Sequence, residues 1–276
     1  MGRLALALVA LVVLGTAGCG GDAGPESVAV GSGSGSTLIA HLYAAALRHY
    51  GSPAHVEPEQ SLMGLDSGDV RVVPEFTGRV LAQLVPGATA RSAAQVYREM
   101  VAALPEGVAA GDYTESAEDK PALAVTERTA DAWGSRDVTA AVRRCDQLRT
   151  GAVSDAPRAG ALGTCKVSKV FEFPDAAAMF AALRAGQINA AWTTTAAPYI
   201  PTQLLMLSDR TSMIRAENVV PLYRRNELDE RQVLALNEVA GVLDTAALAQ
   251  MRADVADGAD PGQVADAFLA ERPLGD

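Results

Sequence analysis

The sequence predicts an α/β protein with largely parallel sheets, and two observations lead to this fold class. Of the 276 residues, 49% are apolar, so the chain can bury a substantial core as one large domain or as two lobes. Short apolar runs alternate along the chain with stretches whose apolar side chains recur every three or four positions. Such alternation is typical of proteins in which sheets and helices form separate layers.

The first predicted strand covers residues 28–30 and leads through a Gly/Ser loop at 31–36 into a helix. Apolar side chains then recur at helical spacing from Leu38 to Leu47. Free N–H groups and hydroxyls at a helix start suit an anionic group such as a carboxylate, so Ser32, Ser36 and Thr37 are candidate ligand contacts. A flexible linker would explain the loop composition equally well. The loop lacks the lysine of a phosphate loop and the GxGxxG order, so nucleotide binding is not supported.

The middle of the chain continues the alternation. A strand at 70–73 leads into a helix that must stop by Pro86, and Ser92 with Gln95 predicts a capping box for the next helix. A buried strand is expected at 122–126, and a capped helix at 176–185 precedes a strand at 188–192. The chain closes on three helices: one at 229–243, one opening at Asp244, and one with Asp260 as its cap and Pro261 at its first position.

The N-terminus, residues 1–19, predicts a secretion signal. Arg3 precedes an apolar run from Leu4 to Leu14 that is too short to span a bilayer comfortably, and small residues follow up to Cys19. This junction resembles a bacterial lipobox, in which Cys19 receives the lipid, and residues 20–27 then form a tether. The alternative is an ordinary signal peptide that is cut at a nearby Ala or Gly. Both interpretations place the mature chain outside the cytoplasm, and the first anchors it to the extracytoplasmic face of the membrane.

The two remaining cysteines, Cys145 and Cys165, predict a structural disulfide, because the compartment is oxidising. Closing a loop of about 20 residues would stabilise the fold by roughly 3 kcal/mol. No metal site or cofactor is expected, since the three histidines lie far from the cysteines and no CxxC or HExxH spacing occurs.

The charge of −10 and the absence of any long Lys/Arg run argue against a nucleic-acid partner. Acidity is compatible with a cationic solute, although many acidic proteins owe their charge to solubility alone.

Several motifs occur in the order found in one known family. They are VGS at 30–32, LYAAAL at 42–47, VPEFTG at 73–78, AGQINAAWTTT at 185–195, NVVPL at 218–222 and DP at 260–261. VPEFTG is similar to the family's PEYTG, and the 186–195 segment is similar to its G-x-(I/V)-D-A-A-x-(Y/T)-T-T-D pattern. The sequence thus resembles the ProX-like osmoprotectant-binding proteins of ABC importers, which bind glycine betaine, choline or carnitine.

The resemblance implies a class II periplasmic-binding-protein fold, in which two α/β lobes enclose the ligand in a cleft. Lobe one is expected at 28–119 plus 207–276, and lobe two at 120–206. The chain would be a membrane-anchored receptor rather than an enzyme, and it would pass a small quaternary amine to the permease and ATPase subunits of an importer.

The resemblance also implies an aromatic cage. A quaternary ammonium cannot donate a hydrogen bond, and each aromatic face attracts it by roughly 0.5 to 2 kcal/mol. The family's aromatic positions fall on Phe76 and Trp192, and Thr77 and Thr194 of the same motifs join the expected ligand contacts. Pro121 and Glu217 stand where many relatives have Tyr, and Thr195 stands where the family has an acid. Glu217 is either a direct partner of a cationic ligand or a solvated surface charge.

Two other functions remain open at this point. The absence of aromatic residues at positions 121 and 217 is also compatible with a lipoprotein that keeps the binding fold. Such a protein would have a different ligand, or it would act as a sensor or partner protein. A secreted hydrolase is the minor alternative, because the Ser cluster at 32, 34 and 36 does not place Ser in GxSxG and the histidines have no paired acid.

Overall fold

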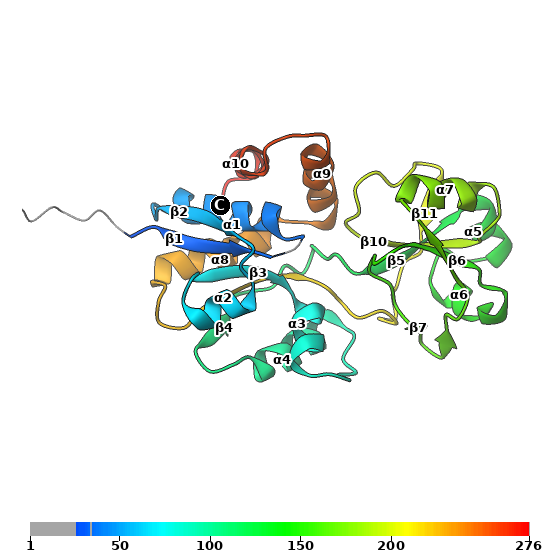
Figure 1. Cartoon of the computed structure of the whole chain (residues 1–276), viewed down its shortest axis with the longest axis horizontal. Helices are drawn as coiled ribbons and strands as arrows, with labels where there is room; N and C mark the ends of the chain where they lie inside the picture. The colour runs from blue at the N-terminus through cyan, green and yellow to red at the C-terminus, as the bar shows by residue number, and fades with distance from the viewer. Residues whose placement is uncertain (1–25, 34, 276) are drawn as a thin grey trace, which may run out of the picture.

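The computed structural model describes residues 26–33 and 35–275, so the signal segment, Cys19 and most of the tether lie outside the described residues. Within that part of the chain, two bodies lie side by side along the longest axis, each built on its own five-stranded sheet (Figure 1). We call them lobe one and lobe two. No single helix of the described residues is long and apolar enough to cross a membrane. The helices α8 (Glu230–Val242) and α9 (Thr245–Ala256) together reach that length, but they are bent by 98°.

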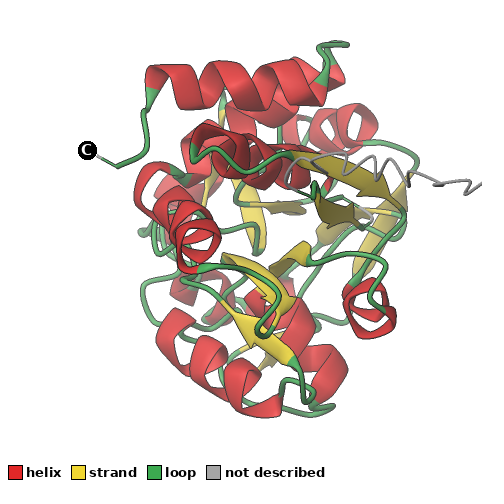
Figure 2. Ribbon diagram, turned by 90° about the vertical axis from the view of Figure 1, so that its left-hand side faces the viewer, coloured by secondary structure: helices red, strands yellow, loops and turns green. Residues whose placement is uncertain are grey.

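Lobe one holds a sheet with the strand order β2-β1-β3-β12-β4. The strands are β1 (Val28–Ser32), β2 (Ala54–Pro58), β3 (Val72–Phe76), β4 (Val108–Ala110) and β12 (Val219–Arg224). One face is covered by α1 (Thr37–His49), α8 (Glu230–Val242), α9 (Thr245–Ala256) and α10 (Pro261–Glu271), and the other by α2 (Leu62–Ser67), α3 (Thr77–Leu84) and α4 (Ala93–Ala103). Figure 2 shows helices on both sides of the strands.

Lobe two holds a sheet with the order β11-β5-β10-β6-β9. Its strands are β5 (Pro121–Thr126), β6 (Thr150–Val153), β9 (Val170–Phe173), β10 (Ala190–Thr194) and β11 (Leu204–Met206). The helices α5 (Glu127–Trp133) and α6 (Thr139–Val142) pack on one face, and α7 (Ala176–Arg184) packs on the other. A small hairpin of β7 (Ala161–Leu162) and β8 (Cys165–Lys166) lies outside the main sheet.

Most strands of each sheet run parallel, as expected, but each sheet contains one reversed strand. In lobe one β12 runs antiparallel to β3 and β4, and in lobe two β5 runs antiparallel to β10 and β11. The reason lies in the connections between the lobes. β5 and β12 are the strands by which the chain enters a lobe from the other one, whereas β1, β2, β3, β6, β9 and β10 end at the edge that faces it.

Most of the helix caps that the sequence predicts are present in the structure. The carboxylates of Asp175, Asp244 and Asp260 accept an N–H three residues on, and Asp229 forms a capping box with Gln232. The capping box expected at Ser92 is absent, because its hydroxyl donates to Oε1 of Gln95 at 3.0 Å and makes no contact with the helix backbone. β3 and β10 lie about two residues later than expected, since pairing with β12 and β5 sets their ends.

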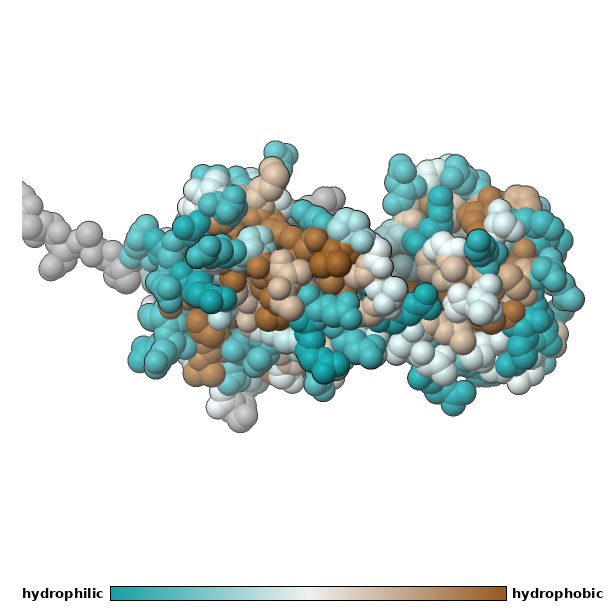
Figure 3. All heavy atoms as spheres, turned by 90° about the horizontal axis from the view of Figure 1, so that it is seen from below, coloured by the Kyte–Doolittle hydropathy of each residue, from teal (hydrophilic) through white to brown (hydrophobic). Residues whose placement is uncertain are grey.

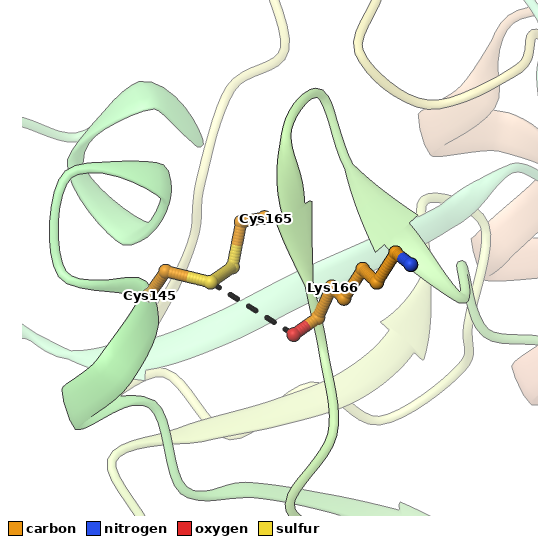
Figure 4. Close-up of a disulfide and its surroundings, with 3 residues drawn as sticks. All are labelled: Cys145, Cys165 and Lys166. Atoms are coloured by element: carbon orange, nitrogen blue, oxygen red, sulfur yellow. Dashed lines mark hydrogen bonds between the residues drawn. A yellow bond between two sulfur atoms is a disulfide. The ribbon is translucent and has the colours of Figure 1, made fainter.

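Cys145 and Cys165 are bonded with an S–S distance of 2.01 Å (Figure 4). The bond joins the short 3₁₀ helix Cys145–Gln147 to the β7–β8 hairpin, and Cys165 is buried in the core of lobe two. The disulfide therefore holds an otherwise loosely paired hairpin on its lobe.

The chain passes from lobe one to lobe two between Asp119 and Lys120. The N–H of Asp119 donates to the carbonyl of Glu217, while the N–H of Lys120 donates to Oγ1 of Thr195. The return was expected at residue 207, but Leu207 and Ile214 belong to the core of lobe two. The return to lobe one therefore comes after residue 214.

Candidate solute-binding cleft

The candidate site lies where the carboxyl ends of the strands of the two lobes face each other. Ser32 and Phe76 end β1 and β3 in lobe one, and Val153 and Thr194 end β6 and β10 in lobe two. Ligands of α/β sheets bind outside these strand ends, which carry the helix N-termini and the loops. Seen from below, the molecule narrows between the two bodies (Figure 3). Both lobes thus present strand ends at this narrow part of the molecule.

Phe76 lies at the cleft edge of lobe one, but its ring is not open to a solute. The side chain is 1% exposed and packs in the core of lobe one. The guanidinium carbon of Arg79, on the first turn of α3, lies 4.2 Å from the ring centroid. A cation at this distance interacts favourably with the face of an aromatic ring. The protein's own arginine thus stacks on the ring that the resemblance assigns to the solute ammonium.

Trp192 is buried in the core of lobe two, with 1% of its surface exposed. Successive side chains of a strand point to opposite faces of the sheet. Ala191 packs on the α7 face, whereas Trp192 packs with Leu123 and Val125 on the opposite face. Phe76 and Trp192 therefore lie in the cores of separate lobes, and the structure does not bring the two rings together. Trp192 also lines the lobe-two pocket described below.

Glu217 caps a helix rather than standing as a solvated surface charge. Its Oε2 accepts the backbone N–H of Arg79 at 2.9 Å, in the first turn of α3. Burial raises the pKa of Glu217 to about 7, against the opposing effects of the Arg79 charge and of that hydrogen bond. Gly78 makes this approach possible, because a Cβ there would collide with the Ala216 carbonyl oxygen and lie 2.9 Å from the Glu217 carboxyl.

Thr77 also has a structural role. Its side chain is fully buried, and its Oγ1 accepts the N–H of Asn218 at 3.2 Å. The amide of Asn218 donates in turn to the carbonyl of Thr114 at 3.0 Å. The EFTG and ENVV segments therefore form a clamp, which we call the lobe-one clamp and define as Thr77, Gly78, Glu217 and Asn218. Because its side chain is buried in this clamp, Thr77 is not available as the ligand contact that was expected from the sequence.

The Gly/Ser loop is folded onto lobe one. Ser32 and Ser36 are buried, with 4% and 5% exposed, and the hydroxyl of Ser36 donates to the carbonyl of Gly33 at 3.1 Å. Neither hydroxyl therefore points freely into the cleft. Thr37, the first residue of α1, is exposed, and no side chain caps this helix start. A Cβ at Gly31 would lie only 2.9 Å from the Cβ of Gln60, so the start of this loop is tightly packed, which argues against a loose linker.

Thr194 borders a pocket of about 560 Å³ in lobe two. The pocket lies between α7 and residues 197–201, and its walls include Phe180 and Tyr199. Sequence reasoning missed Phe180, because the apolar stripe of a helix does not distinguish core residues from pocket residues. One sequence feature could have indicated the pocket: the helix capped by Asp175 follows the end of a strand, and helices in this position begin beside the cleft.

Charged side chains connect the cleft edges close to the crossovers. The buried carboxylate of Asp119 pairs with Arg79 at 3.2 Å and with Arg252 of α9 at 2.9 Å. Arg252 also donates to the carbonyl of Ala196 in lobe two at 3.1 Å. The arginine that covers Phe76 is thereby tied, through Asp119 and Arg252, to the opposite lobe. In the described part of the chain, no group of three or more His, Cys, Asp or Glu is placed to hold a metal ion.

The comparison with protein families agrees with this geometry. Residues 27–271 match the model of the substrate-binding domain of ABC-type glycine betaine transport systems. The chain belongs to this family. It is the substrate-binding component of an ABC importer, and its family is one of binding proteins rather than of enzymes.

Solved structures show the same fold. Apo YehZ from Escherichia coli superposes with a TM-score of 0.72 at 20% identity, covering 90% of this chain and 99% of that one. A glycine betaine/carnitine/choline ABC transporter protein gives a TM-score of 0.74 at 16% identity, covering 89% and 98%. No curated protein sequence matches the chain. The family's two-lobed class II fold, expected from the motifs, is confirmed.

Proposed function

We propose that the chain is an extracytoplasmic lipoprotein that captures a quaternary-amine osmoprotectant, such as glycine betaine or choline, for an ABC importer. The observation that carries the proposal is the family match across residues 27–271. It is supported by the strand ends of both lobes, which face one cleft, and by Arg79, whose stacking indicates that the Phe76 face accommodates a cation.

The proposed contacts are those that reach the cleft. Thr37 at the start of α1 and Thr194 at the end of β10 have side chains with exposed surface, while Ser32 and Ser36 offer mainly backbone groups of the loop. A carboxylate at the uncapped start of α1 would meet N–H groups and the positive end of the helix dipole. The ammonium group would then compete with Arg79 for the Phe76 face.

Transport follows from closure. A solute that contacts both lobes binds the closed form more tightly than the open form and shifts the population toward it. The closed form presents a joined surface of the two lobes to the permease, and the ATPase subunits drive release. In this proposal, Cys19 carries the lipid and residues 20–27 keep the receptor close to its partners on the extracytoplasmic face of the membrane.

Calorimetric titration of the soluble form without residues 1–19 tests the proposal. We expect saturable one-site binding of at least one of glycine betaine, choline and carnitine, and none of an uncharged isostere in which carbon replaces the quaternary nitrogen. The absence of measurable binding for all three cationic solutes would contradict the proposed ligand class. Replacing Cys19 by Ala tests the anchor separately, since the full-length variant should leave the membrane fraction.

A sensor or partner role is the second candidate, and the burial of both Phe76 and Trp192 favours it. The two candidates differ in one measurement. A transport receptor restores uptake of the solute when it is expressed with its permease, whereas a sensor leaves uptake unchanged.

A further inference from the structure

Lobe two contains a groove that borders two of the ligand contacts expected from the sequence, Trp192 and Thr194. It is the pocket of about 560 Å³ between α7 and residues 197–201, which we call the lobe-two groove. Its walls are mainly apolar and include Val153, Pro157, Phe180, Pro198, Ile200 and Pro201. Arg184 is the one charged side chain among its lining residues. The groove is therefore suited to apolar groups.

Small side chains make up part of the lining of the groove. They are Thr193 on β10, Ala176 and Ala177 at the start of α7, and Ala197. A large residue at one of these positions would narrow the space between α7 and residues 197–201. Trp192, whose ring packs in the core of lobe two, also borders the groove.

The wall of the groove opposite α7, formed by residues 197–201, is held in place by a hydrogen bond to lobe one. Tyr199 has a φ of 58°, in the left-handed region that costs a non-glycine residue free energy, and its ring is 55% exposed. Its hydroxyl donates to the carbonyl of Ala253 on α9 at 2.8 Å. This contact fixes residues 197–201 at a distance from α7 and stabilises the strained backbone.

The groove also has a direction. Its mouth is at the cleft, where Val153 and Thr194 end their strands and α7 begins at Ala176. Arg184 ends the same helix eight residues later, roughly 12 Å along the axis. The buried carboxylate of Asp119 and that of Glu217 lie on the lobe-one side of the cleft. A solute would therefore place its cationic group toward the cleft and an uncharged or anionic end toward Arg184.

We propose that the lobe-two groove receives an apolar substituent of the solute, so that the chain prefers quaternary amines carrying a bulky aliphatic or aromatic group to glycine betaine itself. The inference rests on the proposed function. Pockets of roughly 300 to 1,000 Å³ hold drug-sized ligands, and glycine betaine is far smaller than that. Apolar area buried in the groove adds binding free energy at roughly 25 cal/mol per Å².

The test compares two solutes in the soluble form of the chain. They are glycine betaine and its analogue in which a benzyl group replaces one N-methyl group, titrated calorimetrically under the same conditions. We expect the benzyl compound to bind roughly tenfold more tightly, since a buried phenyl ring removes well over 50 Å² of apolar surface from water.

A matched pair of variants locates the effect. Ala177 is the second residue of α7, is exposed and lines the groove, whereas Ala94 is the second residue of α4 in lobe one and is also exposed. In Ala177→Phe the new ring fills the groove, so the affinity ratio of the two solutes should fall toward one. In Ala94→Phe the ratio should stay as in the wild type.

Equal or weaker binding of the benzyl compound by the wild type would overturn the inference while leaving the proposed function intact, provided that glycine betaine binds. A gain that persists in Ala177→Phe would overturn the assignment to this groove. Failure of both solutes to bind would overturn the inference together with the proposed ligand class.

Discussion

The two edges of the cleft differ in how their side chains are used. On the lobe-one edge, Phe76, Thr77, Glu217 and Asn218 are committed to internal contacts: a stacked arginine, a helix cap and hydrogen bonds to backbone groups. On the lobe-two edge, Thr194 opens onto a groove with apolar walls. The family's most specific motif, PEFTG, therefore builds the frame of the site. In our proposal, selection among solutes depends on lobe two, whose motif is the less specific one.

The largest expected effect concerns Trp192, which the resemblance places in the ligand cage and the structure places in the core. Trp192→Ala should lower the free energy of unfolding by about 3–5 kcal/mol, because it leaves a large cavity beneath the lobe-two sheet. Urea unfolding measures this loss. The control is Phe171→Ala, whose ring is 49% exposed and whose loss should cost much less. A small loss for Trp192→Ala with abolished binding would restore Trp192 to the ligand site.

The lobe-one clamp should also be sensitive to a single methyl group. Gly78→Ala should cost about 1–3 kcal/mol, because the new Cβ meets the carbonyl oxygen of Ala216. Gly241→Ala is the matched control in the last turn of α8, where a Cβ meets nothing within 4 Å, and it should stabilise by about 0.4–1 kcal/mol. Thermal unfolding of both variants checks this. Equal effects would mean that EFTG and ENVV do not form a tight clamp.

Glu217 makes the clamp dependent on pH. Its folded-state pKa, about 7, lies above the ordinary value of 4.5, so the folded state holds the proton more tightly than the unfolded state. Its contribution is therefore fully present below about pH 4.5 and is lost as the pH rises to about 7. We expect wild-type stability to fall by roughly 1–3 kcal/mol relative to Glu217→Gln between pH 4.5 and pH 8. Urea unfolding at a series of pH values measures the difference, and parallel profiles would contradict the raised pKa.

The smallest expected effect concerns access to Phe76. Arg79→Gln removes the cation that covers the ring and leaves a polar side chain of similar length, so a quaternary amine no longer competes with it. Affinity for the solute should rise by roughly threefold to tenfold, as one cation–π contact predicts. Calorimetric titration measures the change. Arg98→Gln, an exposed position on α4 of lobe one whose side chain hydrogen-bonds to its own helix, should leave affinity unchanged, and an equal gain in both variants would point to net charge instead.

Sequence reasoning reached the fold but only part of the site, and the difference has a physical cause. The sequence predicts four helix starts correctly, because a capping side chain acts within its own helix: those at Asp175, Asp229, Asp244 and Asp260. The sequence does not predict the antiparallel direction of β5 and β12, because that direction depends on how the chain crosses between the lobes. The burial of Phe76 and Trp192 was also not predictable from the sequence. The motifs indicate where the two residues lie along their strands, whereas the burial of a side chain depends on which face of the sheet is covered by helices.

Lobe closure on a quaternary amine tests the central claim most directly. Cysteines can replace Met63 of lobe one and Phe171 of lobe two, which are 77% and 49% exposed, in the soluble form without Cys19, and both can carry fluorescent labels. We predict that glycine betaine or its benzyl analogue shortens the label-to-label distance in a saturable way, with the midpoint at the calorimetric dissociation constant. A distance that stays constant at saturating concentrations of every quaternary amine tested would contradict the assignment of this cleft as a solute receptor.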